Sequence, residues 1–174
     1  SISTVIESKR AKKAVKVIHQ NFFSDRHTID VFLVGCGNVG TELLGQIEKQ
    51  QPALLKRNVQ LRVYGIANSR KLLLNSQGID LSGDWKAALE SASEGLSVER
   101  LHQFANDNSL VNPVIVECTS HEAIAEQYVD MMESGFHVVT PNKKANTSAM
   151  SYYRKLRKTA QSTNRQYLYE TTVG

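Results

Sequence analysis

The sequence predicts an α/β protein in which a helical extension precedes a doubly wound, mostly parallel sheet. Apolar runs rich in β-branched residues occur without polar alternation, as is typical of parallel strands buried on both faces. Segments with helical periodicity lie between these runs, and this alternation is typical of a sheet covered by helices. The 174 residues fit one such domain, which we expect over residues 28–174, with the extension over residues 1–27.

The composition is that of an ordinary globular protein. Hydrophobic residues make up 41% and charged residues 22% of the chain, with 10 Gly and 3 Pro, which is neither collagen-like nor disordered. No apolar run approaches the roughly 18–20 residues that a membrane-spanning helix needs. The net charge is +4 and the basic residues are dispersed, so we predict neither a membrane nor a nucleic acid as partner.

The cysteines and the first residues bear on location. Cys36 and Cys118 both lie in apolar, strand-like sequence, so we expect no disulfide framework and a reducing, cytoplasmic location. The beginning of the chain is polar and charged and lacks the apolar segment of a signal peptide. The chain begins with Ser1 rather than Met, and we expect it to be part of a longer polypeptide.

The first elements form a helix followed by a strand–helix–strand unit. Residues 5–23 have apolar positions at helical spacing with basic residues between them, which predicts an amphipathic helix with a solvated basic face. Residues 29–34 predict a strand, 41–50 a helix and 61–67 a second strand. We expect Pro52 and the polar residues after it to separate this helix from the second strand.

The second half of the chain continues the alternation. Residues 68–83 are rich in Asn, Ser and Gly, and predict a loop with a short helical turn at 71–74. Two short helices follow, each with a capping residue: Asp84 for 85–92 and Ser97 for 97–105. Further strands and helices are expected at 114–118, 122–134, 136–140, 148–162 and 166–169. Gly135 is expected to end the helix before it.

A glycine-rich turn, Gly35-Cys36-Gly37-Asn38-Val39-Gly40, follows the first main strand. In this G-x-G-x-x-G pattern one glycine permits the tight turn, a second lets the backbone approach a diphosphate, and a third lets helix and strand pack closely. The N–H groups at the start of the helix would receive the phosphates. The alternative is a glycine turn in an unrelated α/β protein. Because a predicted strand precedes the pattern and a predicted helix follows it, we predict a Rossmann-type dinucleotide site at Gly35, Gly37, Asn38, Val39 and Gly40.

The residues after the second strand bear on which dinucleotide is bound. An Asp or Glu there would bond the ribose 2′-hydroxyl of NAD, but the sequence has Asn68, Ser69 and Arg70. Amide, hydroxyl and guanidinium donors can accommodate the 2′-phosphate of NADP. We therefore predict NADP, or the use of both NADP and NAD. An ordinary polar loop with Arg70 in solvent is the alternative.

Two further segments follow strand ends and can contribute to the same edge of the sheet. Thr119 and Ser120 are small enough for close approach to a ribose or nicotinamide, although Ser120 is alternatively a helix cap. Lys143 lies after the next strand, where a lysine can hold a substrate oxygen and relay a proton. From composition alone, a solvated pair with Lys144 is the preferred interpretation. The spacing of His and Cys supports no metal cluster.

Five segments together resemble the nucleotide-binding half of homoserine dehydrogenase, and most closely that of bifunctional aspartokinase–homoserine dehydrogenases. The segments are VFLVGCGNVG (31–40), YGIANS (64–69), ECTS (117–120), HVVTPNKKAN (137–146) and YETTVG (169–174). The resemblance covers residues 28–174, and the block TPNKKA is its most specific part. In such enzymes a regulatory and kinase region precedes this domain, so the extension would be a linker from that region.

The resemblance implies NAD(P)H-dependent interconversion of aspartate-4-semialdehyde and homoserine, on the route to threonine and methionine. It implies that Lys143 is the catalytic or substrate-assisting lysine, and that Asn142 and Thr119 line the ribose–nicotinamide end of the cofactor. It also implies that backbone oxygens of Glu170 and Val173 contribute to a monovalent-cation site in the intact enzyme.

The family pattern continues beyond this chain. In the family, the residues that orient the substrate and most of the dimer-forming sheet follow Gly174, so we expect the substrate and dimerisation domain to be missing after residue 174. We expect this chain to bind the dinucleotide without turning over homoserine, and the intact protein to be a homo-oligomer. Two alternatives are another small NAD(P)-dependent dehydrogenase and a non-catalytic, dinucleotide-sensing regulatory domain.

Overall fold

The structure, a computed structural model, describes residues 3, 5–22, 26–142 and 150–169. Its centre is a sheet of six strands in the order β3-β2-β1-β4-β5-β6. The strands are β1 (His27–Val34), β2 (Val59–Ala67), β3 (Leu72–Leu74), β4 (Pro113–Glu117), β5 (His137–Thr140) and β6 (Tyr167–Tyr169). All neighbours are parallel except β3, which is antiparallel to β2. The prediction of a doubly wound, mostly parallel sheet is confirmed.

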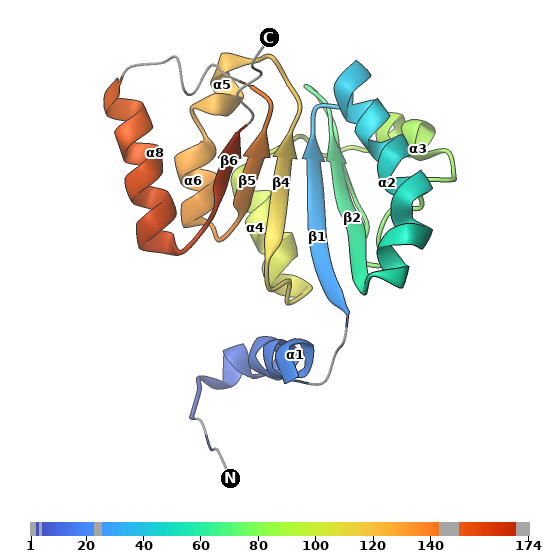
Figure 1. Ribbon diagram of the computed structural model, residues 1–174. Coiled ribbons are helices and arrows are strands. Elements are labelled where there is room, and N and C mark those ends of the chain that lie inside the picture. Colours follow the sequence, from blue (N-terminus) through green and yellow to red (C-terminus); the bar gives the residue numbers. More distant parts are fainter. Residues whose placement is uncertain (1–2, 4, 23–25, 143–149, 170–174) are drawn as a thin grey trace.

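Helices pack on both faces of this sheet, and one more helix, α1, lies below it. They are α1 (Ala11–Phe22), α2 (Asn38–Lys56), α3 (Trp85–Ser91), α4 (Val98–Asp107), α5 (Glu122–Ala125), α6 (Tyr128–Glu133) and α8 (Met150–Thr163), with a short 3₁₀ helix at Ser8–Arg10. Figure 1 shows α1 beneath the starting ends of the strands, away from the edge where the strands end. In the part of the chain that the structure describes, no helix has the length and apolar character needed to cross a bilayer.

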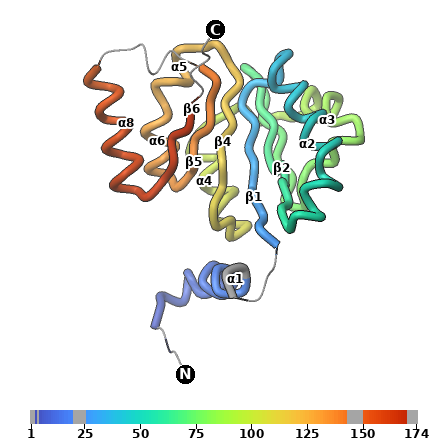
Figure 2. The backbone as a smooth tube through the Cα atoms, viewed as in Figure 1, coloured from blue at the N-terminus to red at the C-terminus, as the bar shows by residue number. Residues whose placement is uncertain are grey.

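Two hydrophobic clusters occupy the two faces of the sheet. Val31, Leu33 and Ile66 pack with residues of α2 and α3 on one face. Alternate residues of the same strands, such as Phe32 and Tyr64, pack with α4, α6 and α8 on the other face. The tube in Figure 2 shows α2 and α3 beside the β1–β2 half and α6 and α8 beside the β4–β6 half.

The predicted helical turn at 71–74 is wrong, because Leu72–Leu74 forms strand β3. Leu72 pairs with Ala67 and Leu74 with Gly65. The reversal between β2 and β3 is made by the Asn68 side chain, whose Oδ1 accepts hydrogen bonds from the backbone N–H groups of Arg70 and Lys71, both at 2.8 Å. An Asn that bonds the backbone two and three residues ahead favours a tight turn over a helix.

Three helix boundaries also differ from the sequence prediction. Pro52 lies inside α2 rather than after it. A proline removes one helical hydrogen bond, and here the helix continues to Lys56 while Leu54 and Leu55 remain half-buried. The helix predicted at 122–134 is two pieces, α5 and α6. The segment predicted as one helix from residue 5 is α-helical from Ala11.

Phe32 is the aromatic centre of the larger cluster. Its ring meets those of Phe104 and Phe136 edge-on, with centroids 5.9 Å and 5.6 Å apart, and stacks on Tyr64 at 6.3 Å. Edge-to-face and offset-stacked rings are the favoured aromatic arrangements. Phe32 thereby joins β1 and β2 to α4 and to the start of β5.

Replacement of Phe32 by Ala should lower the free energy of unfolding by about 3–5 kcal/mol, because it leaves a cavity among three rings. Urea denaturation followed by circular dichroism measures this change. The matched control is Ile29→Ala on the same strand, where the side chain is 37% exposed and the expected loss is about 1 kcal/mol or less. Equal losses for the two variants would contradict this description of the core.

Candidate functional site

Gly35 begins the turn that follows β1, and its backbone requires glycine. Its φ is +95°, in the region that L side chains rarely adopt. A Cβ at this position would lie 2.6 Å from Cγ2 of Thr119. The N–H of Gly35 donates to the carbonyl oxygen of Ala67 at 2.8 Å. The turn is thus fixed against β2 on one side and against the segment after β4 on the other.

Gly37 and Gly40 differ in what surrounds them. Gly37 is the N-cap of α2, has no side chain to cap the helix, and would place a Cβ with no atom within 4 Å. Its backbone therefore faces open space at the positive end of the helix dipole. A Cβ on Gly40 would overlap the carbonyl oxygen of Gly35. The three roles that the sequence pattern predicts, a tight turn, an open approach and close helix–strand packing, occur at the three glycines.

A cavity of about 700 Å³ lies beside this turn. Six of the predicted cofactor residues line it: Gly35, Gly37, Asn68, Ser69, Thr119 and Ser120. It lies at the carboxyl ends of β1, β2 and β4, where the strand order reverses, and ligands of open α/β sheets bind at this point. The structure therefore brings together residues that are up to 85 positions apart in the chain.

The segment after β2 carries basic side chains, and an acidic side chain from α3 lies beside it. Ser69 and Arg70 are exposed, while the amide oxygen of Asn68 is engaged in the turn. Sequence reasoning missed Glu90, which reaches the same cavity from α3. The Glu90 carboxylate lies 3.8 Å from Nζ of Lys71. No signal in the sequence pairs these two residues, because they are brought together only when β3 turns back along β2.

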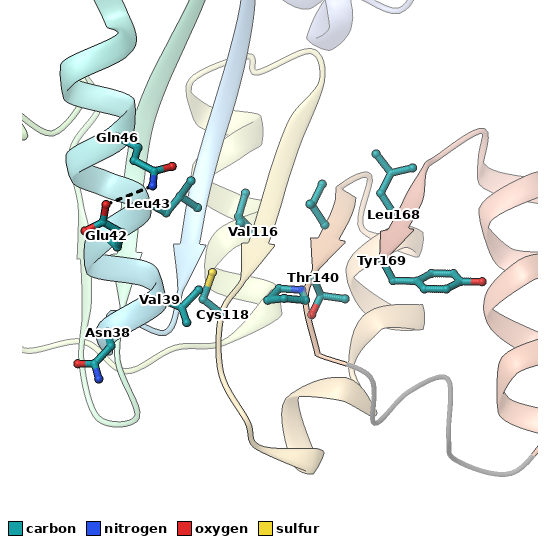
Figure 3. Close-up of a pocket in the computed structure, with 12 residues that line it drawn as sticks. Asn38, Val39, Glu42, Leu43, Gln46, Val116, Cys118, Thr140, Leu168 and Tyr169 are labelled. Carbon is teal, nitrogen blue, oxygen red and sulfur yellow. Dashed lines mark hydrogen bonds between the residues drawn. The ribbon is translucent and has the colours of Figure 1, made fainter. Parts of the chain in front are cut away.

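A second cavity, of about 900 Å³, lies on the other side of the glycine turn (Figure 3). Asn38 and Val39 of α2 line it, together with Cys118, Thr140 and side chains from β6. Its walls are mainly apolar, and Val39 is 59% exposed. Two of the predicted cofactor residues therefore face this cavity rather than the first.

The two cysteines are unsuited to nucleophilic chemistry. Burial, with a smaller effect from the Glu117 charge, raises the pKa of the Cys118 thiol to about 11. Burial likewise raises the pKa of Cys36. Both are free thiols, and a thiol rather than a thiolate is a poor nucleophile. Within the described ranges no group of three or more His, Cys, Asp or Glu side chains could hold a metal ion.

The remaining predicted residues lie at the end of β5 and beyond. Asn142 is buried, with 8% of its surface exposed, and its backbone N–H donates to Oγ1 of Thr140 at 2.9 Å. Lys143, Glu170 and Val173 lie outside the described residues. The catalytic lysine and the monovalent-cation site therefore stay predictions.

Fold and site together define the class of protein. A glycine turn at the switch point of a 3-2-1-4-5-6 sheet, with a cavity beside it, makes this a dinucleotide-binding domain of Rossmann type. Residues 35–170 match the family described as "Homoserine dehydrogenase, NAD binding domain". The chain belongs to this family.

Two curated relatives align with the whole chain, and both are named bifunctional aspartokinase/homoserine dehydrogenase. The Haemophilus influenzae protein is 47% identical over 100% of this chain and 21% of its own length. The Buchnera aphidicola protein is 44% identical over 100% of this chain and 21% of its own. The chain thus spans about a fifth of the length of these relatives.

A solved structure shares the fold. A hyperthermophilic archaeal homoserine dehydrogenase in complex with NADPH matches with a TM-score of 0.65 at 20% identity, covering 84% of this chain and 45% of that one.

Alanine at Gly37 and at Gly40 should have different effects. Gly37→Ala should cost about 1 kcal/mol of stability or less. It should weaken NADPH binding about tenfold or more, because the new methyl group would occupy the space through which the diphosphate approaches the backbone. Gly40→Ala should lower the free energy of unfolding by about 1–3 kcal/mol, because the methyl group would overlap the carbonyl oxygen of Gly35 and the packed core keeps α2 and β1 from moving apart. Calorimetric titration and urea denaturation measure the two effects. Undiminished NADPH affinity in Gly37→Ala would exclude this turn as the diphosphate site.

Proposed function

We propose that this chain is the cofactor-binding part of an enzyme that interconverts aspartate-4-semialdehyde and homoserine with NADPH or NADH. The observation that carries the proposal is the glycine turn, in which Gly37 leaves the start of α2 open while Gly35 and Gly40 hold it against β1 and β4. Family membership supports the choice of reaction.

The residues present fit a dinucleotide. The unobstructed backbone at Gly37 and the N–H groups at the start of α2 would hold the diphosphate. Ser69 and the exposed Arg70 would hold the adenosine ribose, with Arg70 favouring a 2′-phosphate. Thr119 and Asn142 would line the ribose–nicotinamide end.

The chemistry divides between the cofactor and the chain. When bound, the nicotinamide ring supplies the hydride that reduces the aldehyde. Lys143 would hold the aldehyde oxygen and donate a proton to it as it becomes a hydroxyl. Backbone oxygens of Glu170 and Val173 would contribute to a monovalent-cation site in the intact enzyme.

The intact enzyme extends beyond this chain in the proposal, as in relatives about five times as long. Residues 1–27 would link residues 28–174 to a preceding region, and later segments would supply the substrate-orienting residues and the contacts of a homo-oligomer. The chain alone would bind NADPH without converting homoserine. The proposed location is the cytoplasm, in keeping with two free thiols.

Removal of the guanidinium in Arg70→Ala should weaken NADPH binding about tenfold or more and leave NADH binding within about twofold. A charge-assisted hydrogen bond to the 2′-phosphate contributes about 1.5–3 kcal/mol, and NADH lacks that group. Calorimetric titration of the chain with both dinucleotides measures the difference. Arg57→Ala, at an exposed position after α2, is the control. Equal affinity of the unchanged chain for NADPH and NADH would refute the role of Arg70.

Replacement of Lys143 by Met in the intact protein should lower kcat for homoserine about a hundredfold or more, the usual contribution of a general acid or base. Affinity for NADPH should stay within about twofold. Steady-state kinetics and calorimetry measure the two quantities, and the 174-residue chain assayed alone should show no turnover. An unchanged kcat in Lys143→Met would refute the catalytic role of Lys143, whereas an intact protein that converts no homoserine would favour a dinucleotide-sensing domain over an enzyme.

A further inference from the structure

Glu117 is a buried carboxylate with no role in the proposed reaction. It ends β4 and has no exposed surface. Along this strand the buried residues alternate, which directs Glu117 to the sheet face packed by α6 and the larger hydrophobic cluster. A carboxylate in such surroundings is costly unless hydrogen-bond donors surround it.

Three donors converge on the two oxygens of Glu117. The backbone N–H of Thr119 donates to Oε1 at 2.6 Å. The Tyr128 hydroxyl donates to Oε2 at 2.6 Å, and the Thr140 hydroxyl donates to the same oxygen at 2.7 Å. An ionised carboxylate accepts hydrogen bonds and donates none, so it suits all three partners at once. The partners come from the segment after β4, from α6 and from the last residue of β5.

The side-chain bond between Glu117 and Thr140 continues the strand pairing beyond its last backbone pair. The β4–β5 register ends at Val116 opposite Val139, so Glu117 and Thr140 are the next residues along the two strands. Here the carboxylate joins the ends of the two strands one residue beyond that pair.

Two of the three partners, Thr119 and Thr140, contact residues of the candidate site. Thr119, held by Oε1, packs against Gly35 of the glycine turn. Thr140, held by Oε2, accepts the backbone N–H of Asn142 at 2.9 Å. Asn142 directly precedes Lys143 in the sequence. The buried Glu117 side chain therefore links the glycine turn beside the first cavity to Asn142, the residue before Lys143.

We propose that Glu117 is a positioning residue, which sets the separation between the Thr119 turn and Asn142, the residue that precedes Lys143. This role rests on the proposed function, in which one segment lines the cofactor and the other carries Lys143. Misplacement of reacting groups by about 1 Å can lower a rate about a hundredfold. Loss of a residue that fixes two such segments can therefore lower kcat, even though the residue does not touch the reacting atoms.

Amide hydrogen exchange in the 174-residue chain tests the link without any assay of activity. Glu117→Met removes the acceptor, and protection at both Thr119 and Asn142 should fall about tenfold or more relative to Phe32 in β1. Thr140→Val should expose Asn142 alone, and Thr140→Ser should restore it. Tyr128→Phe removes a bond to the same carboxylate from α6, together with a longer contact of 3.2 Å to Oγ1 of Thr140. It leaves the acceptors of both amides in place and should change neither amide more than about threefold. Glu117→Gln keeps an acceptor and should resemble the unchanged chain.

Kinetics of the intact protein test the consequence. Glu117→Met and Thr140→Val should each lower kcat about tenfold or more. Of these two variants, only Glu117→Met should also raise KM for NADPH. Thr140→Ser should have the kcat of the unchanged protein. Tyr128→Phe should stay within about threefold in kcat, although it lowers thermal stability as Thr140→Val does.

The outcomes separate the two proposals. Uniform loss of protection in Glu117→Met, including Phe32, would reduce Glu117 to a structural residue and overturn the inference. Selective exposure of Thr119 and Asn142 with unaltered kcat would also overturn it. Selective exposure in a protein whose unchanged form converts no homoserine would instead overturn the proposed function and leave the link between the two segments standing.

Discussion

The close approach of α2 to the end of β1 is the constraint on which the candidate site depends. The backbone of Gly40 lies so near the carbonyl oxygen of Gly35 that no side chain fits between them. This contact brings the start of α2 directly over the edge of the sheet, where its N–H groups and dipole face outward. Any larger residue at Gly40 would push the helix away and withdraw the positive end from the edge.

The same contact organises the neighbouring strands. Gly35 bonds to the end of β2 through its N–H and packs against Thr119 after β4, so the ends of three strands are fixed by one turn. Glu117 then carries the connection from β4 to β5 through buried hydrogen bonds. The edge is therefore a series of contacts from β2 to β5. Backbone geometry fixes the contacts from β2 to β4, and the hydrogen bonds accepted by the buried Glu117 side chain fix those from β4 to β5.

Much of this architecture could be predicted from the sequence, because it depends on local patterns. β-Branched runs indicated the parallel strands, Asp84 and Ser97 cap their helices as expected, and the glycine pattern located the turn. What was missed depends on tertiary contacts. Leu72–Leu74 resembles a helical turn until β2 offers it a partner. Glu117 lies in an apolar run, and only the folded structure surrounds it with donors from two other elements.

The charges around the first cavity bear on which dinucleotide it suits. In the described part of the chain, Glu90 is the carboxylate that lines this cavity, and it comes from α3 rather than from the end of β2, where an NAD-binding domain usually has its acid. Glu90 lies beside the Lys71 ammonium, so these two charges offset each other. Arg70 is exposed and does not itself line the cavity, but it follows the lining residues Asn68 and Ser69 and adds a positive charge there. In the proposed function, a 2′-phosphate would match this balance better than a neutral ribose hydroxyl, since a phosphate would supply a negative charge and can accept two hydrogen bonds from a guanidinium. Selection of NADP would then arise from the absence of an acid after β2 as much as from the presence of Arg70.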